Sequence, residues 1–66
     1  MRVFVSGETK EFADILKLND LLRHLDMPAQ RIAVELNKSV VRRKDWPETD
    51  VRENDKIEIV HFVGGG

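Results

Sequence analysis

Residues 56–63 read KIEIVHFV, and their side chains alternate between the two faces of a strand. Apolar side chains fall on both faces, with Ile57, Ile59 and His61 on one and Glu58, Val60 and Phe62 on the other. A strand that is apolar on both faces is typical of the centre of a sheet. We therefore expect this segment to be the central strand around which the other elements are arranged.

The N-terminal stretch MRVFVSGETKEF, residues 1–12, predicts a hairpin. Met1, Val3 and Val5 alternate with the intervening side chains, which is the period of a half-buried strand. Gly7 can adopt a positive φ, so the Ser6–Gly7 step can reverse the chain into a second strand.

Residues 16–28, LKLNDLLRHLDMP, change to a helical period. The four leucines that follow the i, i+3, i+4, i+7 spacing of one helix face are Leu18, Leu21, Leu22 and Leu25. Pro28 disfavours helical geometry at the preceding residue and predicts the end of the helix. Both ends have weak capping residues, Lys17 at the start and Asp26 at the end.

The second half of the chain returns to strand patterns. Residues 31–37 alternate, and a turn after them leads into a short strand at Val40–Val41. Residues 42–55 are polar and turn-rich, which predicts an irregular connection before the last strand. The fold class is therefore α+β, a mixed sheet of four to five strands with one main helix packed on one face.

The composition limits the functions of the chain. A chain of 66 residues forms one domain with a small core, which leaves little room for an internal substrate cavity. Its net charge is −1, so we expect no general nucleic-acid binding. It has no cysteine, and no apolar stretch approaches the length of a signal core or a membrane span. These features predict a cytoplasmic protein without disulfides or a thiolate site.

Side chains that could bind a metal ion or a partner are scattered along the chain. His24 and His61 are interpreted as two ordinary histidines rather than metal ligands. The one basic cluster, Arg42 to Lys44, is interpreted as a solvated turn rather than a docking patch. The acidic residues expected to balance it are Asp45, Glu48 and Asp50. Trp46 is either an interface anchor or, with at least equal support, a lid on the edge of the core.

The open face of the sheet offers a binding surface. If one helix covers one face, Phe4, Val60 and Phe62 lie together on the other. A contiguous apolar patch on a small domain often binds a partner. The alternative, equally weighted, is a register shifted by one residue, which would pack these side chains inward.

The run Gly64–Gly66 follows the last strand directly. It is either a linker or a functional tail, because glycines can enter a narrow channel and extend about 10 Å at ~3.3–3.6 Å per residue. In a functional tail the reactive group is the Gly66 carboxylate.

The segments RIAVELNKSVVRRKDW (31–46) and NDKIEIVHFVGGG (54–66) resemble the ThiS family of sulfur carriers in thiamin biosynthesis, and the resemblance covers essentially the whole chain. It implies a ubiquitin-like β-grasp domain over residues 1–63 and a flexible glycine tail at 64–66. Three turn residues depart from those that the family often has, namely Ser6 for Asn, Asp26 for Gly and Asn54 for Gly.

The resemblance also implies a mechanism and partners. A partner adenylating enzyme uses ATP and magnesium to convert the Gly66 carboxylate to an acyl-adenylate. Sulfur from a cysteine desulfurase relay then displaces AMP, and thiazole synthase consumes the resulting thiocarboxylate. The residues implied to thread the tail are Gly64 and Gly65, and those implied to dock partners are Phe4, Val60, Phe62 and Val63. The chain itself is then a carrier, monomeric when free, that binds no cofactor or metal.

Three alternatives stay open at this level. The chain could carry sulfur for molybdopterin synthesis or tRNA thiolation, since those carriers share the fold and the diglycine end. It could instead be a protein modifier joined through Gly66 to lysines of target proteins. It could also be a binding module whose tail has no role.

Overall fold

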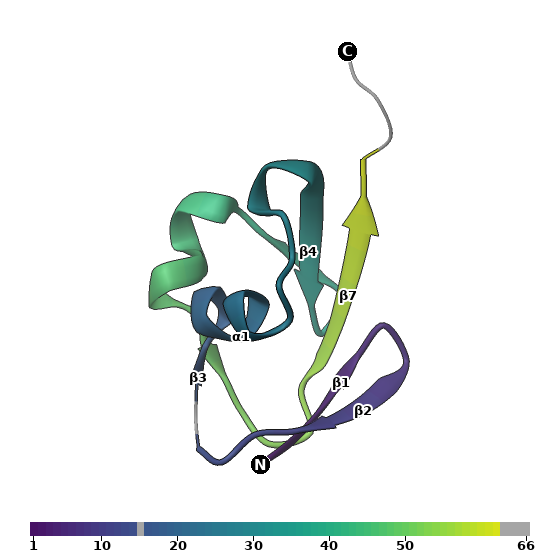
Figure 1. Cartoon of the computed structure of the whole chain (residues 1–66), viewed down its shortest axis with the longest axis vertical. Helices are drawn as coiled ribbons and strands as arrows, with labels where there is room; N and C mark the ends of the chain where they lie inside the picture. Colours follow the sequence, from purple (N-terminus) through teal and green to yellow (C-terminus); the bar gives the residue numbers. More distant parts are fainter. Residues whose placement is uncertain (15, 63–66) are drawn as a thin grey trace.

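The computed structural model describes residues 1–14 and 16–62, and Figure 1 shows their arrangement. Five strands form one mixed sheet in the order β2-β1-β7-β4-β5. The strands are β1 (Arg2–Val5), β2 (Glu8–Glu11), β4 (Ile32–Leu36), β5 (Ser39–Val41) and β7 (Lys56–His61). β7 pairs with β1 in parallel and with β4 antiparallel. The prediction that residues 56–63 contain the central strand is therefore confirmed, as are the N-terminal hairpin and the mixed sheet.

The helix α1 (Leu18–His24) forms one side of the core. Leu18, Leu21 and Leu22 are buried, as their spacing predicted, and Leu25 packs partly against them. The side chains they meet come from the inward positions of the sheet, namely Val3, Val5, Ile32, Val34 and Ile57. Within the described part of the chain, no helix has the length and apolar content needed to cross a membrane.

The C-terminal end of α1 depends on Asp26. The Asp26 amide donates to the Arg23 carbonyl at 3.0 Å, and the Met27 amide donates to the Leu22 carbonyl at 3.1 Å. This pair of hydrogen bonds defines a Schellman motif, which requires a left-handed residue after the helix. Asp26 takes that conformation at φ 57°. The weak cap noted in the sequence thus coincides with a backbone geometry that favours glycine.

Asp26→Gly is expected to stabilise the protein by about 0.5–1 kcal/mol, because glycine adopts a left-handed conformation without the Cβ penalty. The gain should appear as a higher urea midpoint at an unchanged m-value. The matched control is Asp26→Ala, which keeps a Cβ and should lower the midpoint. A lower midpoint for the glycine variant would show that the Asp26 side chain matters more than the backbone angle.

The other reversals are also left-handed. Ser6 and Asn54, which depart from the family pattern, have φ 49° and 69°. Asn37 and Lys38 between β4 and β5 have φ 51° and 73°, the signs of a type I′ hairpin turn. The Asn37 side chain also receives the Lys56 amide at 2.9 Å and donates to Asp55 at 3.0 Å, so it ties this hairpin to the start of β7.

The prediction of an irregular segment over residues 42–55 is partly wrong. It contains the 3-10 helix η2 (Arg43–Glu48) and the strand β6 (Asp50–Val51). β6 pairs with β3 (Leu16–Lys17) in a second sheet of two strands, and another 3-10 turn, η1 (Ala29–Arg31), precedes β4. These elements are too short to produce a readable hydrophobic period.

Trp46 on η2 is a core residue. Its side chain is 2% exposed, and its Nε1–H donates to the Val41 carbonyl at 2.9 Å. η2 packs against α1, so the indole closes the edge of the core beside the helix. The interpretation of Trp46 as a lid is confirmed, and the interpretation as an exposed interface anchor is wrong.

Candidate functional site

The predicted tail begins where β7 leaves the sheet. The Phe62 amide donates to the Arg31 carbonyl at 2.8 Å, which extends the pairing with β4 by one residue beyond His61. The four predicted site residues after it, Val63, Gly64, Gly65 and Gly66, lie outside the described residues. The strand that precedes them in the sequence is hydrogen-bonded to β4 up to Phe62.

Val60 and Phe62 occupy the face of the sheet opposite α1. Val60 pairs with Ala33 and is 53% exposed, while Phe62 is 56% exposed. The inward residue between Glu58 and Val60 is Ile59, which packs against the core, so the register is the one that places Val60 outward. The alternative register, in which these side chains pack inward, is wrong.

Phe4 lies on the same face but at a distance from Val60 and Phe62. It pairs with Lys56 at the start of β7, four residues before Val60, which corresponds to about 13 Å at ~3.3 Å per residue. Its ring is half-buried and lies under the Arg2 guanidinium, 5.7 Å from the ring centroid. The structure therefore brings together Val60 and Phe62 but does not include Phe4 in one patch with them.

A third exposed apolar side chain extends the patch on the other side. Val40 on β5 is 70% exposed and pairs with Glu35 on β4, which lies on the same face as Ala33, two residues earlier in that strand. We call Val40, Val60 and Phe62 the open-face patch. Val40 was not predicted as a site residue, although its alternation with the partly buried Val41 could have indicated its outward position.

The two histidines lie on separate elements. His24 Nδ1 is 3.0 Å from the Asp20 carbonyl oxygen, and its ring meets Phe12 edge-on with centroids 6.1 Å apart. His61 ends β7 opposite Ile32. Among residues 1–14 and 16–62, no three His, Cys, Asp or Glu side chains are grouped so that they could hold a metal ion.

The basic cluster Arg42 to Lys44 is exposed at the start of η2. In the described chain, none of the three forms an ion pair with the acidic neighbours that were expected to balance them. Asp50 instead binds Lys17 and Arg52. The expectation of local charge balance is therefore wrong for Asp50, because β6 carries that carboxylate across to β3.

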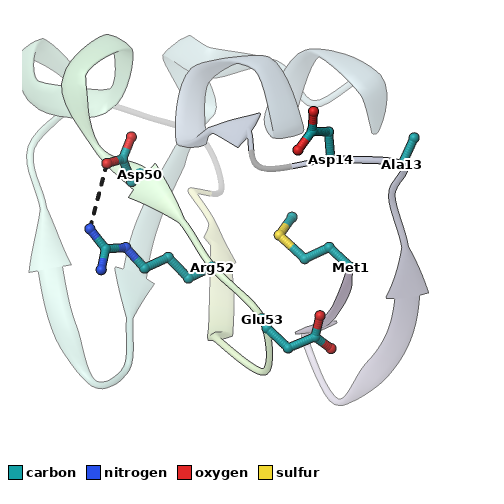
Figure 2. A pocket seen from close by; sticks show the side chains of 6 residues that line it. All are labelled: Met1, Ala13, Asp14, Asp50, Arg52 and Glu53. Atoms are coloured by element: carbon teal, nitrogen blue, oxygen red, sulfur yellow. Dashed lines mark ion pairs between the residues drawn. The ribbon is translucent and has the colours of Figure 1, made fainter.

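A surface pocket of about 490 Å³ lies near the N-terminus, and Figure 2 shows its lining. The lining residues are Met1, Ala13, Asp14, Asp50, Arg52 and Glu53. Two of its carboxylates already have partners within the fold: Asp50 pairs with Arg52 at 3.7 Å, and Glu53 accepts the Arg2 amide at 3.1 Å. It lies beside the N-terminus, whereas the chain leaves the sheet at the opposite end of Figure 1. We regard it as a structural junction rather than a site.

Lys17 lowers the pKa of Asp50, first through a hydrogen bond from Nζ to Oδ1 at 2.5 Å and then through its charge. Arg52 adds to this effect, and loss of hydration opposes it. Because the folded-state pKa is depressed, the pair stabilises the fold above the unfolded-state pKa, and this contribution is lost as the pH falls through the folded-state pKa. Both side chains are partly exposed, so salt should weaken the effect.

Lys17→Met is therefore expected to raise the pKa of Asp50 toward the ordinary value of about 3.9. A carboxyl ¹³C NMR titration measures this shift directly. Lys10→Met is the matched control, since Lys10 pairs with Glu8 at 3.4 Å on β2 and should leave Asp50 unchanged. An Asp50 midpoint that is equal in all three proteins would contradict the assigned cause.

Comparison with known proteins relates the whole chain to one family. The sequence profile of the ThiS family matches residues 2–66. The sulfur carrier protein ThiS of Bacillus subtilis (strain 168) is 39% identical over 49 residues, covering 74% of each chain. The crystal structure of the thiamine biosynthesis protein ThiS from Geobacter metallireducens superposes with a TM-score of 0.88 at 33% identity, and the match covers 100% of both chains.

A second kind of relative is much longer than this chain. The thiazole synthase of Magnetococcus marinus (strain ATCC BAA-1437 / JCM 17883 / MC-1) is 38% identical over 66 residues. The match covers 100% of this chain but 20% of that protein. A segment similar to this chain is thus one part of a polypeptide named for thiazole synthesis.

Proposed function

The chain belongs to the ThiS family, and we propose that it acts as a sulfur carrier in thiamine biosynthesis, with sulfur carried on the C-terminal carboxylate of Gly66. The observation that carries this proposal is the end-to-end match with ThiS at a TM-score of 0.88. The ubiquitin-like β-grasp fold agrees with it, because the central strand β7 leads directly toward the glycine run. The chain is then a co-substrate of other enzymes rather than an enzyme itself.

The proposed chemistry has two steps at the Gly66 carboxylate, the first at an oxygen and the second at the carbonyl carbon. An activating enzyme first joins the carboxylate to the α-phosphate of ATP, with magnesium, and releases pyrophosphate. A sulfur nucleophile then forms a C–S bond while the C–O bond to AMP breaks and AMP leaves with the electron pair. A carboxylate is a poor electrophile, so the adenylate supplies the leaving group that the carboxylate lacks. In the cell, the sulfur is proposed to come as a persulfide from a cysteine desulfurase relay, and a thiol reductant then cleaves the resulting acyl disulfide to the thiocarboxylate.

Thiazole synthase is the proposed consumer of the thiocarboxylate. This partner is supported by the polypeptide from Magnetococcus marinus, which combines a segment similar to this chain with a much longer remainder. Val60 and Phe62 are proposed to dock partners beside the tail, with Val63 next to them. Phe4 is proposed to contribute a separate contact at the start of β7, because the sheet places it there. These events are proposed to occur in the cytoplasm.

Intact-mass spectrometry tests the proposal. The purified chain is incubated with the cognate activating enzyme, ATP, magnesium and sulfide, and a mass increase equal to one oxygen replaced by sulfur is expected at the C-terminal peptide. No increase, under conditions in which the Bacillus subtilis ThiS reacts with its own enzyme, would contradict the proposal.

The competing functions predict different products when thiazole synthase or a cell lysate is added to this preparation. A carrier for molybdopterin synthesis or tRNA thiolation would acquire sulfur but would not support thiazole formation by thiazole synthase. A protein modifier would produce a ladder of heavier conjugates joined through Gly66. The thiamine proposal requires both the sulfur transfer and thiazole formation.

A further inference from the structure

Two glutamates lie directly opposite each other at the centre of the open face. Glu58 on β7 pairs with Glu35 on β4, two residues along each strand from the pair formed by Val60 and Ala33. Residues paired in this way have Cα atoms about 4.5–5.5 Å apart and side chains on the same face. The register therefore places the two glutamates on the same face of the neighbouring strands β7 and β4.

The fold leaves this pair uncompensated. Like charges directly opposite each other across two strands are destabilising. Among the described residues, neither Glu35 nor Glu58 forms an ion pair. Lys56, two residues before Glu58 on the same face, forms none with them either. The free protein is thus expected to keep an electrostatic cost on a surface that residues 1–14 and 16–62 leave without a packing partner.

The pair has exposed apolar side chains on two sides. Val40 lies on the far side of Glu35, and Val60 lies two residues beyond Glu58 on the same face. The two valines are 70% and 53% exposed. The carboxylates are therefore framed by apolar side chains that a partner would cover, and covering them would strengthen any charge pairing at the centre.

We propose that Glu35 and Glu58 together bind an arginine side chain of thiazole synthase. This contact makes the open face bind thiazole synthase in preference to other proteins. The inference rests on the proposed function, which names that partner. A guanidinium has five N–H donors in a planar fork and can donate to two carboxylates at once, which an ammonium group does less well. Thiazole synthase is the occupant because the match to Magnetococcus marinus places a segment similar to this chain in one polypeptide with it.

The test measures binding and stability in the same variants. Glu58→Gln and Glu35→Gln are expected to weaken binding of the full chain to purified thiazole synthase by about 10- to 100-fold in calorimetry. The same variants should raise the urea midpoint of the free chain, because the like-charge contact is removed. Affinity should also fall less steeply with salt than in the unchanged protein. If the pair had a purely structural role, its substitution would not weaken binding while it raised the stability of the free protein.

Glu48→Gln is the matched control. Glu48 is an exposed residue at the end of η2, and its substitution makes the same change in net charge away from the open face. It should leave binding unchanged. Equal affinities of Glu58→Gln, Glu48→Gln and the unchanged protein for thiazole synthase would overturn the inference. It would also be overturned if Glu58→Gln lost binding to the activating enzyme but kept its binding to thiazole synthase.

Sulfur transfer separates this inference from the proposed function. Glu58→Gln should still gain the mass of one sulfur replacement with the activating enzyme, ATP and sulfide. If it does so and still binds thiazole synthase normally, the inference is wrong and the sulfur-carrier proposal stands. If the unchanged protein itself gains no sulfur, the proposed function is wrong.

Discussion

Gly66→Leu is expected to reduce the thiocarboxylated fraction more than ~100-fold while leaving the fold intact, since small misplacements of a reacting group have effects of that order. The reacting atom is the main-chain carbonyl carbon of Gly66, so a bulky side chain on the same residue changes the immediate surroundings of the reaction. Glycine is also the residue that can take backbone angles closed to others in a narrow channel. Intact-mass spectrometry after reaction with the activating enzyme measures the effect.

Two further variants sharpen this prediction. A chain extended by one alanine after Gly66 keeps every residue but moves the carboxylate, and it should also fail to gain sulfur. Glu48→Gln, which changes an exposed side chain on η2, should react normally. All variants should have the same urea midpoint as the unchanged protein. Sulfur transfer to Gly66→Leu at the normal rate would show that Gly66 is not the acceptor.

The sequence predicted the parts of the fold that have long periodic patterns. The apolar pattern on both faces of residues 56–63 predicted the central position of β7, because such a pattern is typical of a strand with neighbours on both edges. The spacing of Leu18, Leu21 and Leu22 predicted the buried face of α1. The pairing of β3 with β6 had no such signal, since each strand is two residues long and they are far apart in the chain.

The turns show why local residue preferences are incomplete guides. Ser6, Asp26 and Asn54 differ from the residues expected of the family, yet all three have positive φ. Hydrogen bonds fix each conformation: the Asn54 amide, for example, donates to the Arg2 carbonyl at 2.6 Å. The backbone geometry is thus set by hydrogen bonds, long-range at Ser6 and Asn54 and local at Asp26, and the residue identity changes only its cost.

The residues of the candidate site also differ in how far the sequence could place them. Alternation along β7 predicted that Val60 and Phe62 share one face of the strand, and the structure shows that this face points outward. Grouping Phe4 with them required the register between β1 and β7, and the register puts Phe4 beside Lys56 instead. The contact between Glu35 and Glu58 also depends on register, in this case between strands more than twenty residues apart. Such cross-strand neighbours are invisible in a single sequence.

Trp46→Ala is expected to destabilise the protein by about 3–5 kcal/mol. The indole is 2% exposed at the edge of a small core, and its removal leaves a cavity between η2 and α1 and an unpaired carbonyl at Val41. A domain of 66 residues has a total stability of roughly 3–10 kcal/mol at ~0.05–0.15 kcal/mol per residue. The loss is therefore comparable with the whole stability, and urea unfolding followed by circular dichroism should show a protein that is largely unfolded or close to it.

Trp46→Phe provides a variant whose stability can be measured if Trp46→Ala does not fold. It retains an aromatic ring but loses the Nε1–H donor to Val41, which lies 2.9 Å away. The expected cost is smaller, about 1–3 kcal/mol, from the lost hydrogen bond and the reduced volume. The intermediate midpoint would show that packing volume at the edge of α1 contributes more than the hydrogen bond does. A phenylalanine variant as unstable as the alanine variant would reverse that order, and a cost below about 1 kcal/mol for alanine would contradict the assignment of Trp46 to the core.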